Sequence, residues 1–297
     1  MPARAEVAGT GGRAAREPVA PARLCLGARA YDITSRALVM GILNRTTDSF
    51  FDRGAHFEMD RFLARAGQLV AEGADLLDVG GVKAGPGPEV SAAEELDRVV
   101  PAVSALAARF DIPISVDTWR AEVAGAAFEA GACVGNDISG FADPDYLAVA
   151  AEAGASVVAT HIRLLPRIPD PRPHYDDVVA TVSGELAALA GAAEAAGIPP
   201  ERIMIDAGLD LGKTAEQSST LLRASDRLAA LGRPLLLSAS NKTFLGVLLG
   251  LDIDHRREAS LSATALGVAL GCRVVRAHDV LGTRRVCDTL AAVLGAG

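Results

Sequence analysis

The chain has 297 residues, of which 50% are hydrophobic and 4% aromatic, and its formal net charge is -8 at pH 7. This length allows one large domain or two small ones, and the acidic balance argues against a general nucleic-acid binder. The scarcity of aromatic residues favours helices packed closely on a sheet over an aromatic-rich sandwich. A small anionic substrate is compatible with these numbers, because individual loops can be positive on an acidic protein.

The four cysteines, Cys25, Cys133, Cys272 and Cys287, lie far apart and form no CxxC motif. This distribution predicts small, buried or partly buried thiols in a reducing compartment. Residues 1–22 are rich in Ala, Gly, Arg and Pro and lack the apolar core of a signal peptide, so we expect a disordered tail and a cytoplasmic protein. No apolar run approaches the roughly 18 to 20 residues that cross a bilayer, so no membrane partner is expected.

A single barrel domain is predicted over residues 23–297. Its first element, Arg23–Ile33, is expected to be a short strand or hairpin that covers one end of the fold. From Ala37 onward, short apolar runs that end in polar residues or Gly alternate with Ala-rich amphipathic segments. The eight apolar runs are Ala37–Asn44, Ala74–Gly81, Ile112–Thr118, Ala132–Ser139, Ala155–His161, Ile203–Gly208, Pro234–Ser240 and Cys272–Asp279.

Helix-like segments lie between these runs, and a glycine follows most of them where a helix C-cap is expected. The segments are Asp60–Glu72, Ala92–Arg109, Ala121–Ala130, Pro144–Ala153, Val178–Ala196, Ser218–Leu231 and Ser260–Leu270. The glycines are Gly73, Gly131, Gly154, Gly197, Gly232 and Gly271. Eight rounds of strand and helix predict an α/β fold with a parallel, closed (β/α)8 TIM barrel. An open Rossmann sheet ranks second, because no GxGxxG turn follows the first run.

Polar residues collect at the C-terminal ends of the apolar runs, where TIM barrels carry their active sites. Packing does not explain this pattern, because a buried carboxylate is costly without a partner. A helix cap or a supporting hydrogen bond is an alternative for any single residue, but the set as a whole predicts a site. Its members are Asn44, Asp48, Asp78, Asp117, Thr118, Asn136, Asp137, His161, Asp206, Ser240, Lys242, Arg276, His278 and Asp279.

The stretch Pro234–Phe244, PLLLSASNKTF, contains the most informative residue of this set. Of the 29 Lys and Arg residues only three are lysines, Lys83, Lys213 and Lys242. Each lies in a Gly-rich or strand-end loop, which indicates a requirement for a compact ammonium group, with chance survival in an Arg-biased composition as the alternative. Thr243 is predicted to cap a following helix.

Convergent Asp and Asn side chains offer donors and acceptors to a flat, nitrogen-rich heterocycle, and Lys242 is suited to contact a carbonyl of such a ring or to lie above it. Asn44, Arg276 and His278 are suited to hold an anionic leaving group or its metal. The sequence contains neither a GxSxG nucleophile elbow nor an HExxH or clustered-His zinc motif. The residues alone therefore predict a barrel that binds a polar planar ligand, with or without a phosphate.

Six spaced motifs resemble the dihydropteroate synthase family, and they run in the family's order from about Ala37 to the C-terminus. They are MGILNRTTDSFFDRG (Met40–Gly54), GADLLDVGG (Gly73–Gly81), PISVDTWRAEVAGAAFEAGACVGNDISG (Pro113–Gly140), IDAGLDLGK (Ile205–Lys213), SNKTFLG (Ser240–Gly246) and RAHDV (Arg276–Val280). The resemblance implies a (β/α)8 barrel that joins 6-hydroxymethyl-7,8-dihydropterin pyrophosphate to p-aminobenzoate. It also implies that Mg²⁺ assists the departure of pyrophosphate, and that the protein is a homodimer.

The same resemblance assigns roles to individual positions. The residues that match the family's pterin-binding positions are Asp117, Asn136, Asp206 and Lys242. Arg276 and His278 match the pyrophosphate-binding pair, and Asn44 matches the residue near the metal and the pyrophosphate. The resemblance implies a catalytic set of Lys242, Asp117 and Asp48.

Two mobile loops depart from the family pattern. The first loop usually reads TPDSF, and here Thr47 replaces the proline. The second loop usually reads GGESTRPG, and here Gly80–Gly87 reads GGVKAGPG, so that the Ser-Thr-Arg triplet becomes Lys83, Ala84 and Gly85. An ammonium group does not reproduce the bidentate fork of a guanidinium. Losing one transition-state hydrogen bond of this kind commonly costs a factor on the order of 100 in rate.

Further departures lie near the predicted pterin site. The family pattern DPGxGFGK becomes Asp206–Lys213 with a new carboxylate at Asp210, and SRK becomes SNK with Asn241 in place of Arg. These variants resemble the second, diverged dihydropteroate synthase copy of some high-GC bacteria, a subgroup regarded as lacking or nearly lacking the synthase activity. A diverged homologue with little or no activity is therefore the first hypothesis.

Two other hypotheses are considered. One is a working synthase in which Lys83 and Arg45 compensate for the altered loop. The other, less favoured, is a pterin-dependent methyltransferase, although nothing in the sequence indicates a docking segment for a corrinoid partner. The Pro-rich segment Arg163–Asp177 is expected to be irregular, and an exposed connection is the favoured interpretation. Covering the mouth of the barrel and contacting a partner are the alternatives.

Overall fold

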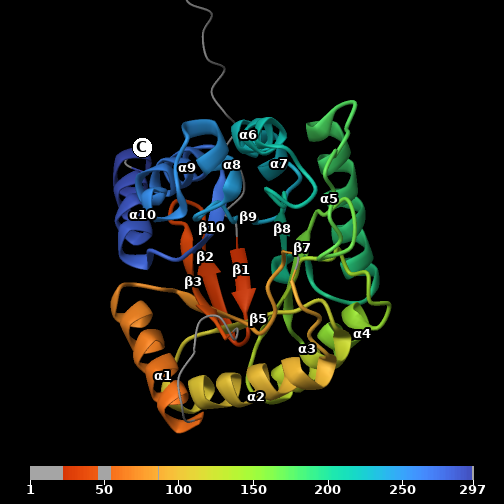
Figure 1. Ribbon diagram of the computed structural model, residues 1–297, viewed down its shortest axis with the longest axis vertical. Helices are drawn as coiled ribbons and strands as arrows, with labels where there is room; N and C mark the ends of the chain where they lie inside the picture. The colour runs from red at the N-terminus through yellow and green to blue at the C-terminus, as the bar shows by residue number, and fades with distance from the viewer. Residues whose placement is uncertain (1–22, 46–54, 86, 296–297) are drawn as a thin grey trace, which may run out of the picture.

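The computed structural model describes residues 23–45, 55–85 and 87–295. Eight parallel strands close into a barrel in the order β10-β3-β4-β5-β6-β7-β8-β9, and an antiparallel hairpin of β1 and β2 precedes them (Figure 1). The strands are β1 (Arg23–Leu26), β2 (Arg29–Asp32), β3 (Leu38–Asn44), β4 (Leu76–Gly80), β5 (Ile114–Asp117), β6 (Val134–Asp137), β7 (Ser156–Thr160), β8 (Ile203–Asp206), β9 (Leu235–Leu237) and β10 (Cys272–Ala277). The predicted (β/α)8 barrel is confirmed, and each of the eight apolar runs contains one barrel strand. The expected tail over residues 1–22 lies outside the described residues.

The helices surround the barrel and connect its strands. They are α1 (Ala55–Ala71), α2 (Ala92–Arg109), α3 (Ala121–Glu129), α4 (Tyr146–Glu152), α5 (Val178–Ala195), α6 (Ala215–Arg223), α7 (Ser225–Ala229), α8 (Thr243–Leu249), α9 (Arg257–Ala269) and α10 (Val280–Leu294). The predicted segment Ser218–Leu231 is two helices, α6 and α7, and α10 is absent from the predicted segments. The six glycines expected at helix ends all have positive φ, from 61° to 116°, as a left-handed C-terminal residue requires.

Several helices begin at a side chain that accepts hydrogen bonds from the free N–H groups of the first turn. These caps are Ser91, Asp177, Thr214 and Asp279. Asp279 belongs to the polar set at the strand ends, and its Oδ1 accepts from Gly282 N at 2.9 Å. For this residue the helix-cap alternative is therefore the one observed.

The hairpin closes the N-terminal end of the barrel, as the sequence predicts. Leu24 and Leu26 are buried in one cluster with Leu38, Leu76 and other residues that lie near the starts of the barrel strands. Burial of each leucine contributes about 1.5 to 3 kcal/mol to stability. Arg202 Nη2 also donates to Gly27 O at 2.9 Å, which fixes the hairpin turn to the segment that leads into β8.

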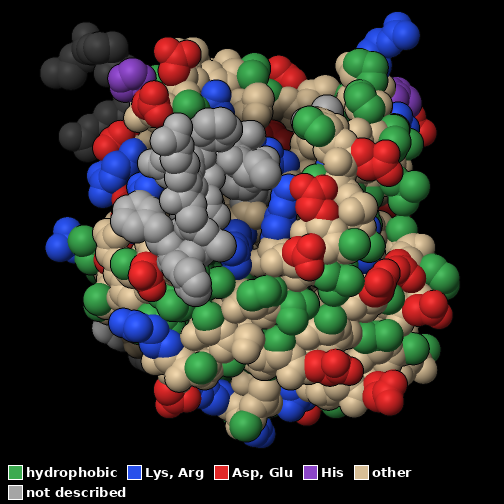
Figure 2. Space-filling model, turned by 60° about the horizontal axis from the view of Figure 1, so that its bottom comes forward, with side chains coloured by type: hydrophobic (Ala, Val, Ile, Leu, Met, Phe, Trp, Pro, Cys, Tyr) green, Lys and Arg blue, Asp and Glu red, His purple; other side chains and the backbone are tan. Residues whose placement is uncertain are grey.

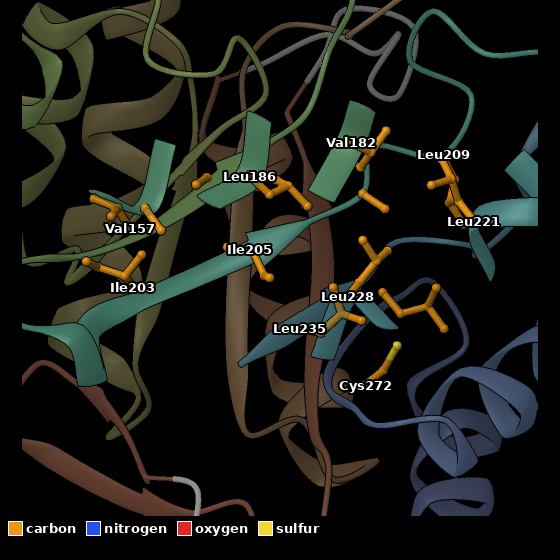
Figure 3. Close-up of a cluster of buried hydrophobic side chains, with 14 of the residues drawn as sticks. Val157, Val182, Leu186, Ile203, Ile205, Leu209, Leu221, Leu228, Leu235 and Cys272 are labelled. Atoms are coloured by element: carbon orange, nitrogen blue, oxygen red, sulfur yellow. The ribbon is translucent and has the colours of Figure 1, made fainter. Parts of the chain in front are cut away.

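A larger apolar cluster lies outside β7, β8 and β9, beneath α5, α6 and α7 (Figure 3). In this cluster Ile205 on β8 lies near Leu186 of α5, and Ile203 on the same strand lies beside Val157 of β7. Contrary to the sequence expectation, α5 is long and apolar enough to cross a membrane by length and composition, with 18 residues of mean hydropathy 1.3. Its Ala and Val content produces this value, and in the fold its buried face covers the barrel.

Candidate active site

A layer of polar side chains lies inside the barrel, toward the C-terminal ends of the strands. Alternate residues of a strand point to the same side, so each of these side chains comes two residues after another interior side chain. Four of the preceding residues are Leu76, Val134, Met204 and Val274, which belong to the interior apolar cluster. The polar residues that follow them are Asp78, Asn136, Asp206 and Arg276, and Asp117 follows Ser115 in the same way. The barrel therefore brings together five side chains that the sequence places up to 198 residues apart.

Asp78 is the centre of this polar layer and is completely buried. Its carboxylate accepts hydrogen bonds from Ser115 Oγ at 2.6 Å and from Arg276 Nε at 2.6 Å. Asn136 Nδ2 lies 3.3 and 3.4 Å from its two oxygens. The family resemblance did not assign Asp78 a role, although its position two residues beyond Leu76 is the signal that places it in the interior.

Arg276 joins two carboxylates. Its Nε contacts Asp78, and its Nη2 donates to Asp117 Oδ2 at 2.7 Å. These partners raise the pKa of Arg276, so the guanidinium stays charged. Burial raises the pKa of Asp117 to about 7, and the nearby Arg276 only partly opposes this effect. Asp117 is thus subject to two opposing influences, desolvation and the positive charge of Arg276.

Asp206 and Lys242 lie at the opposite side of the layer. Asp206 Oδ1 accepts from Gly208 N at 2.8 Å, and Lys242 Nζ donates to Leu209 O at 3.0 Å. Burial raises the pKa of Asp206 and lowers the pKa of Lys242, in each case toward the uncharged form. The loop that follows β8 therefore positions both side chains.

Lys213 stabilises the conformation of this loop by hydrogen bonds to its backbone. Its Nζ donates to Gly208 O and Leu211 O, both at 2.9 Å, and lies 2.8 Å from His161 Nδ1. Burial lowers the pKa of Lys213 to about 7, and burial together with Lys213 lowers the pKa of His161 to about 3. Gly208 is required at the closest approach, because a β-carbon there would lie 1.9 Å from His161 O.

A cavity of about 660 Å³ opens above the polar layer, at the mouth of the barrel. Lys and Arg side chains gather around a hollow in the face shown in Figure 2. The cavity lining includes Ala84, Gly85, Ile162, Leu164, Leu165, Arg167, Ile168, Asp210, Lys213, Lys242, Arg276 and His278. His278 Nδ1 lies 3.0 Å from Ser240 Oγ, and partial desolvation together with the neighbouring Arg276 lowers the pKa of His278. His278 is therefore neutral at physiological pH.

Comparison with known proteins identifies this arrangement. A family model described as pterin binding enzyme matches residues 40–278. The chain is 46% identical over 266 residues to the protein named "Inactive dihydropteroate synthase 2" of Mycobacterium leprae, covering 88% of this chain and 91% of the relative. It is also 40% identical over 276 residues to the dihydropteroate synthase of Synechocystis, covering 92% and 96%.

The chain belongs to the pterin-binding enzyme family. Solved structures agree, because the dihydropteroate synthase of Stenotrophomonas maltophilia superposes with a TM-score of 0.84 at 40% identity, over 93% of this chain and 99% of the other. A structure of the Xanthomonas albilineans synthase with 4-aminobenzoic acid gives a TM-score of 0.86 at 38% identity, over 93% and 100%. The protein is thus a diverged dihydropteroate synthase homologue.

The structure brings together the pterin-binding positions that the resemblance assigned. Asn136 contacts Asp78, Asp78 and Asp117 share Arg276, and Asp206 and Lys242 are joined through the loop after β8. Arg276 and His278 both line the cavity. The predicted catalytic residue Asp48 lies outside the described residues.

Asn44, predicted to lie near the metal, is exposed at the end of β3. A β-carbon on the neighbouring Gly80 would lie 3.5 Å from both Asn44 Oδ1 and Asp117 Cβ, so Asn44 and Asp117 flank this glycine. Within the described residues no group of three or more His, Cys, Asp or Glu is arranged to hold a metal. One amide oxygen still fits Mg²⁺, which commonly takes most of its ligands from water and substrate phosphates.

Asp210, at a position where the family pattern has glycine, contacts the start of α8. Its φ of 67° is the left-handed conformation that glycine adopts readily, and its carboxylate accepts from the backbone N–H groups of Thr243 and Phe244. The predicted capping role of Thr243 is wrong, because Lys242 is the N-cap residue and Asp210 supplies the acceptor from another loop. This contact fixes the start of α8 immediately after Lys242.

The Pro-rich segment Arg163–Asp177 forms part of the cavity wall. Seven of its residues, from Leu164 to Pro171, line the cavity. Arg163 pairs with Asp170 inside the segment, and Tyr175 Oη donates to Gly212 O at 2.9 Å. The segment is irregular, as predicted, but the favoured interpretation of a mere exposed connection is wrong, because its residues line the mouth of the barrel.

Proposed function

We propose that this protein binds a pterin in the polar layer of the barrel and catalyses dihydropteroate formation slowly or not at all. The observation that carries the proposal is the contrast between two parts of one cavity. The buried layer holds Asp78, Asp117, Asn136, Asp206 and Lys242 in contact with one another or with fixed backbone. The second loop, in contrast, has lost the side chains of the family's Ser-Thr-Arg triplet.

The polar layer suits a pterin because it combines carboxyl, amide and ammonium groups in a buried space. A flat heterocycle with ring nitrogens, an exocyclic amine and a carbonyl can use donors and acceptors of both kinds. The proposed contacts are those of Asp117, Asn136, Asp206 and Lys242. A structure of the Xanthomonas albilineans synthase in complex with 7,8-dihydropteroate, which is 37% identical to this chain, supports the same ligand class.

Arg276, His278 and Asn44 are the proposed neighbours of an anionic pyrophosphate group. When bound with that group, Mg²⁺ would neutralise its negative charge and make it a better leaving group. Asn44 is the proposed protein ligand of the ion. Arg276 is already paired with two carboxylates, and His278 is neutral, so these two residues offer hydrogen bonds and a partly compensated charge.

The altered second loop accounts for a slow or absent reaction. Its residues at the cavity are Ala84 and Gly85, neither of which offers a side-chain hydrogen bond to p-aminobenzoate or to the leaving group. Arg45, which the active-synthase hypothesis needs as a compensating cation, donates to Arg98 O on α2 at 3.2 Å. The loss of even one transition-state contact costs a factor on the order of 100 in rate.

A combined binding and turnover experiment tests this proposal. We expect 7,8-dihydropterin pyrophosphate at millimolar concentration to raise the melting temperature of the wild type, because a ligand that binds only the native state stabilises it. Asp206→Ala and Lys242→Ala should abolish that shift, and wild type with p-aminobenzoate and Mg²⁺ should release little or no pyrophosphate. A wild type without a thermal shift contradicts pterin binding, and rapid turnover contradicts the inactive assignment.

We also propose that the protein is a cytoplasmic homodimer. Exposed apolar side chains on α8, α9 and α10 support an interface there, and they are Val247, Leu248, Leu249, Leu266 and Leu281. The free state of all four cysteines agrees with a reducing compartment. Sedimentation analysis of the wild type and of Leu249→Asp tests the dimer, and cell fractionation tests the compartment.

A further inference from the structure

We propose that Arg167 supplies, from the Pro-rich segment, the guanidinium that the second loop lacks, and that it binds the carboxylate of an aromatic ligand at the cavity mouth. The proposal deepens the proposed function, because it concerns the outer part of the same cavity. It assigns a specificity-determining role to a residue that none of the six family motifs contains.

The first observation is the position of Arg167 beside the altered loop. Its Nη2 donates to Gly87 O at 2.6 Å and also to Pro88 O. Arg167 lines the cavity together with Ala84 and Gly85 of the second loop. A side chain from a segment about 80 residues away therefore lies beside the loop in which the family carries an arginine.

The second observation is that the segment holds Arg167 in an unusual backbone conformation. Its φ is 67°, which side chains other than glycine, Asn and Asp rarely adopt. A turn stabilises this conformation, because Ile168 N donates to Leu165 O, and Arg163 pairs with Asp170 on either side of it. The local structure thus turns the arginine toward the second loop.

The third observation is the charge around Arg167. Within the part of the chain that the structure describes, no carboxylate forms an ion pair with it, since Asp170 pairs with Arg163 and Asp210 accepts from the start of α8. The two hydrogen bonds of Nη2 go to neutral carbonyl groups. The positive charge of Arg167 is therefore not neutralised by the protein, and a planar guanidinium is suited to a bidentate contact with a carboxylate.

The fourth observation is the apolar surface next to this charge. Leu164, Leu165 and Ile168 line the same cavity with exposures of 38, 58 and 56%. Large apolar side chains that remain exposed around one concave site indicate a ligand with an apolar face. An aromatic ring that carries one carboxylate satisfies both the apolar wall and the unpaired guanidinium.

A pair of nearly isosteric ligands tests this assignment by calorimetric titration. The wild type should bind p-aminobenzoate at least about tenfold more tightly than neutral p-aminobenzamide, as a charge-assisted hydrogen bond predicts. Arg167→Ala should reduce this ratio to about twofold or less, and Arg167→Lys should restore only part of it, because an ammonium group lacks the fork. Arg172→Ala is the matched control, since it removes one positive charge from an exposed position of the same segment and should leave the ratio unchanged.

Equal affinities for the two ligands in the wild type, no binding of either, or an unchanged ratio in Arg167→Ala would each overturn the proposal. A purely structural role for Arg167 would weaken both ligands equally, and this outcome also contradicts it. The titrations are run with and without 7,8-dihydropterin pyrophosphate, and the thermal shift caused by the pterin is measured separately. Failure of pterin binding is thereby distinguished from failure of the assignment to Arg167.

Discussion

The polar layer forms the floor of the cavity, and the loops above it form the mouth. These two regions differ in how the fold holds their residues. The floor side chains come from barrel strands, and they are buried in a network around Asp78 and Arg276. The mouth residues come from loops, and several of them, such as Ala84 and Gly85, contribute no polar side chain. A buried charge that loses its partner is strongly destabilising, whereas a loop can change at little cost to the core. Folding stability alone is therefore enough to preserve the floor, while the mouth is free to diverge.

The largest expected effect is on the floor. Asp78→Ala leaves Ser115, Asn136 and the buried side of Arg276 without their common acceptor, so we expect a loss of about 3 to 5 kcal/mol in the free energy of unfolding. Urea denaturation measures this change. Asp111→Ala is the matched control, because the fully exposed side chain of this aspartate pairs with Arg29 at the surface and its loss should have a far smaller effect. Similar stability losses in the two variants would show that the floor network is not required by the fold.

A smaller effect is expected from the mouth. The triple variant Lys83→Ser, Ala84→Thr and Gly85→Arg should raise pyrophosphate release about 10- to 100-fold over the wild type, because it returns transition-state hydrogen bonds. The new arginine has room, since no atom lies within 4 Å of a β-carbon at Gly85. Unfolding stability should stay close to that of the wild type.

The same triple variant with Asp206→Ala is the control, and it should again be inactive. If the triple variant is no faster than the wild type, the block to catalysis lies elsewhere in the mouth, and the contact of Asp210 with α8 is the next position to revert to glycine.

The smallest effect at neutral pH concerns His161, which supports the floor, because this effect develops only as the solution becomes acidic. The folded-state pKa of His161 is about 3, against an ordinary value of 6.5. Between these two pH values, this histidine therefore binds a proton more readily in the unfolded chain than in the folded chain. The free energy of unfolding should therefore fall as the pH falls through this range, with a slope of up to about 1.4 kcal/mol per pH unit. His161→Gln should lose this contribution. The exposed His255→Gln should keep it, and an identical slope in both variants would contradict a buried, neutral His161.

The sequence predicts the barrel well because its evidence is local and repeated. Each apolar run of the predicted set contains a strand, and each of the six glycines ends a helix in the left-handed conformation. The floor is also predictable, because residues that end parallel strands meet at one end of a barrel. Asp78 belongs to the predicted polar set, but the family resemblance gave it no role. In the structure its carboxylate holds Ser115, Asn136 and Arg276.

The contacts of the mouth are not predictable in the same way. Asp210 reaches Thr243 across 33 residues, and Arg167 reaches Gly87 across 80 residues. Such contacts depend on the conformations of two irregular loops at once. Sequence periodicity and capping patterns do not predict the conformation of an irregular loop. The sequence therefore indicated that Asp210 was new without indicating that it would replace Thr243 as the cap of α8.

The β1–β2 hairpin determines from which side this molecule can be extended. It seals the barrel at the end away from the cavity, with Leu24 and Leu26 inserted among the strand starts. A label or a fused domain joined ahead of Arg23 is therefore attached on the far side from the ligand entrance. Immobilisation through that attachment leaves the entrance open to solvent, which suits surface-based binding measurements with small aromatic acids.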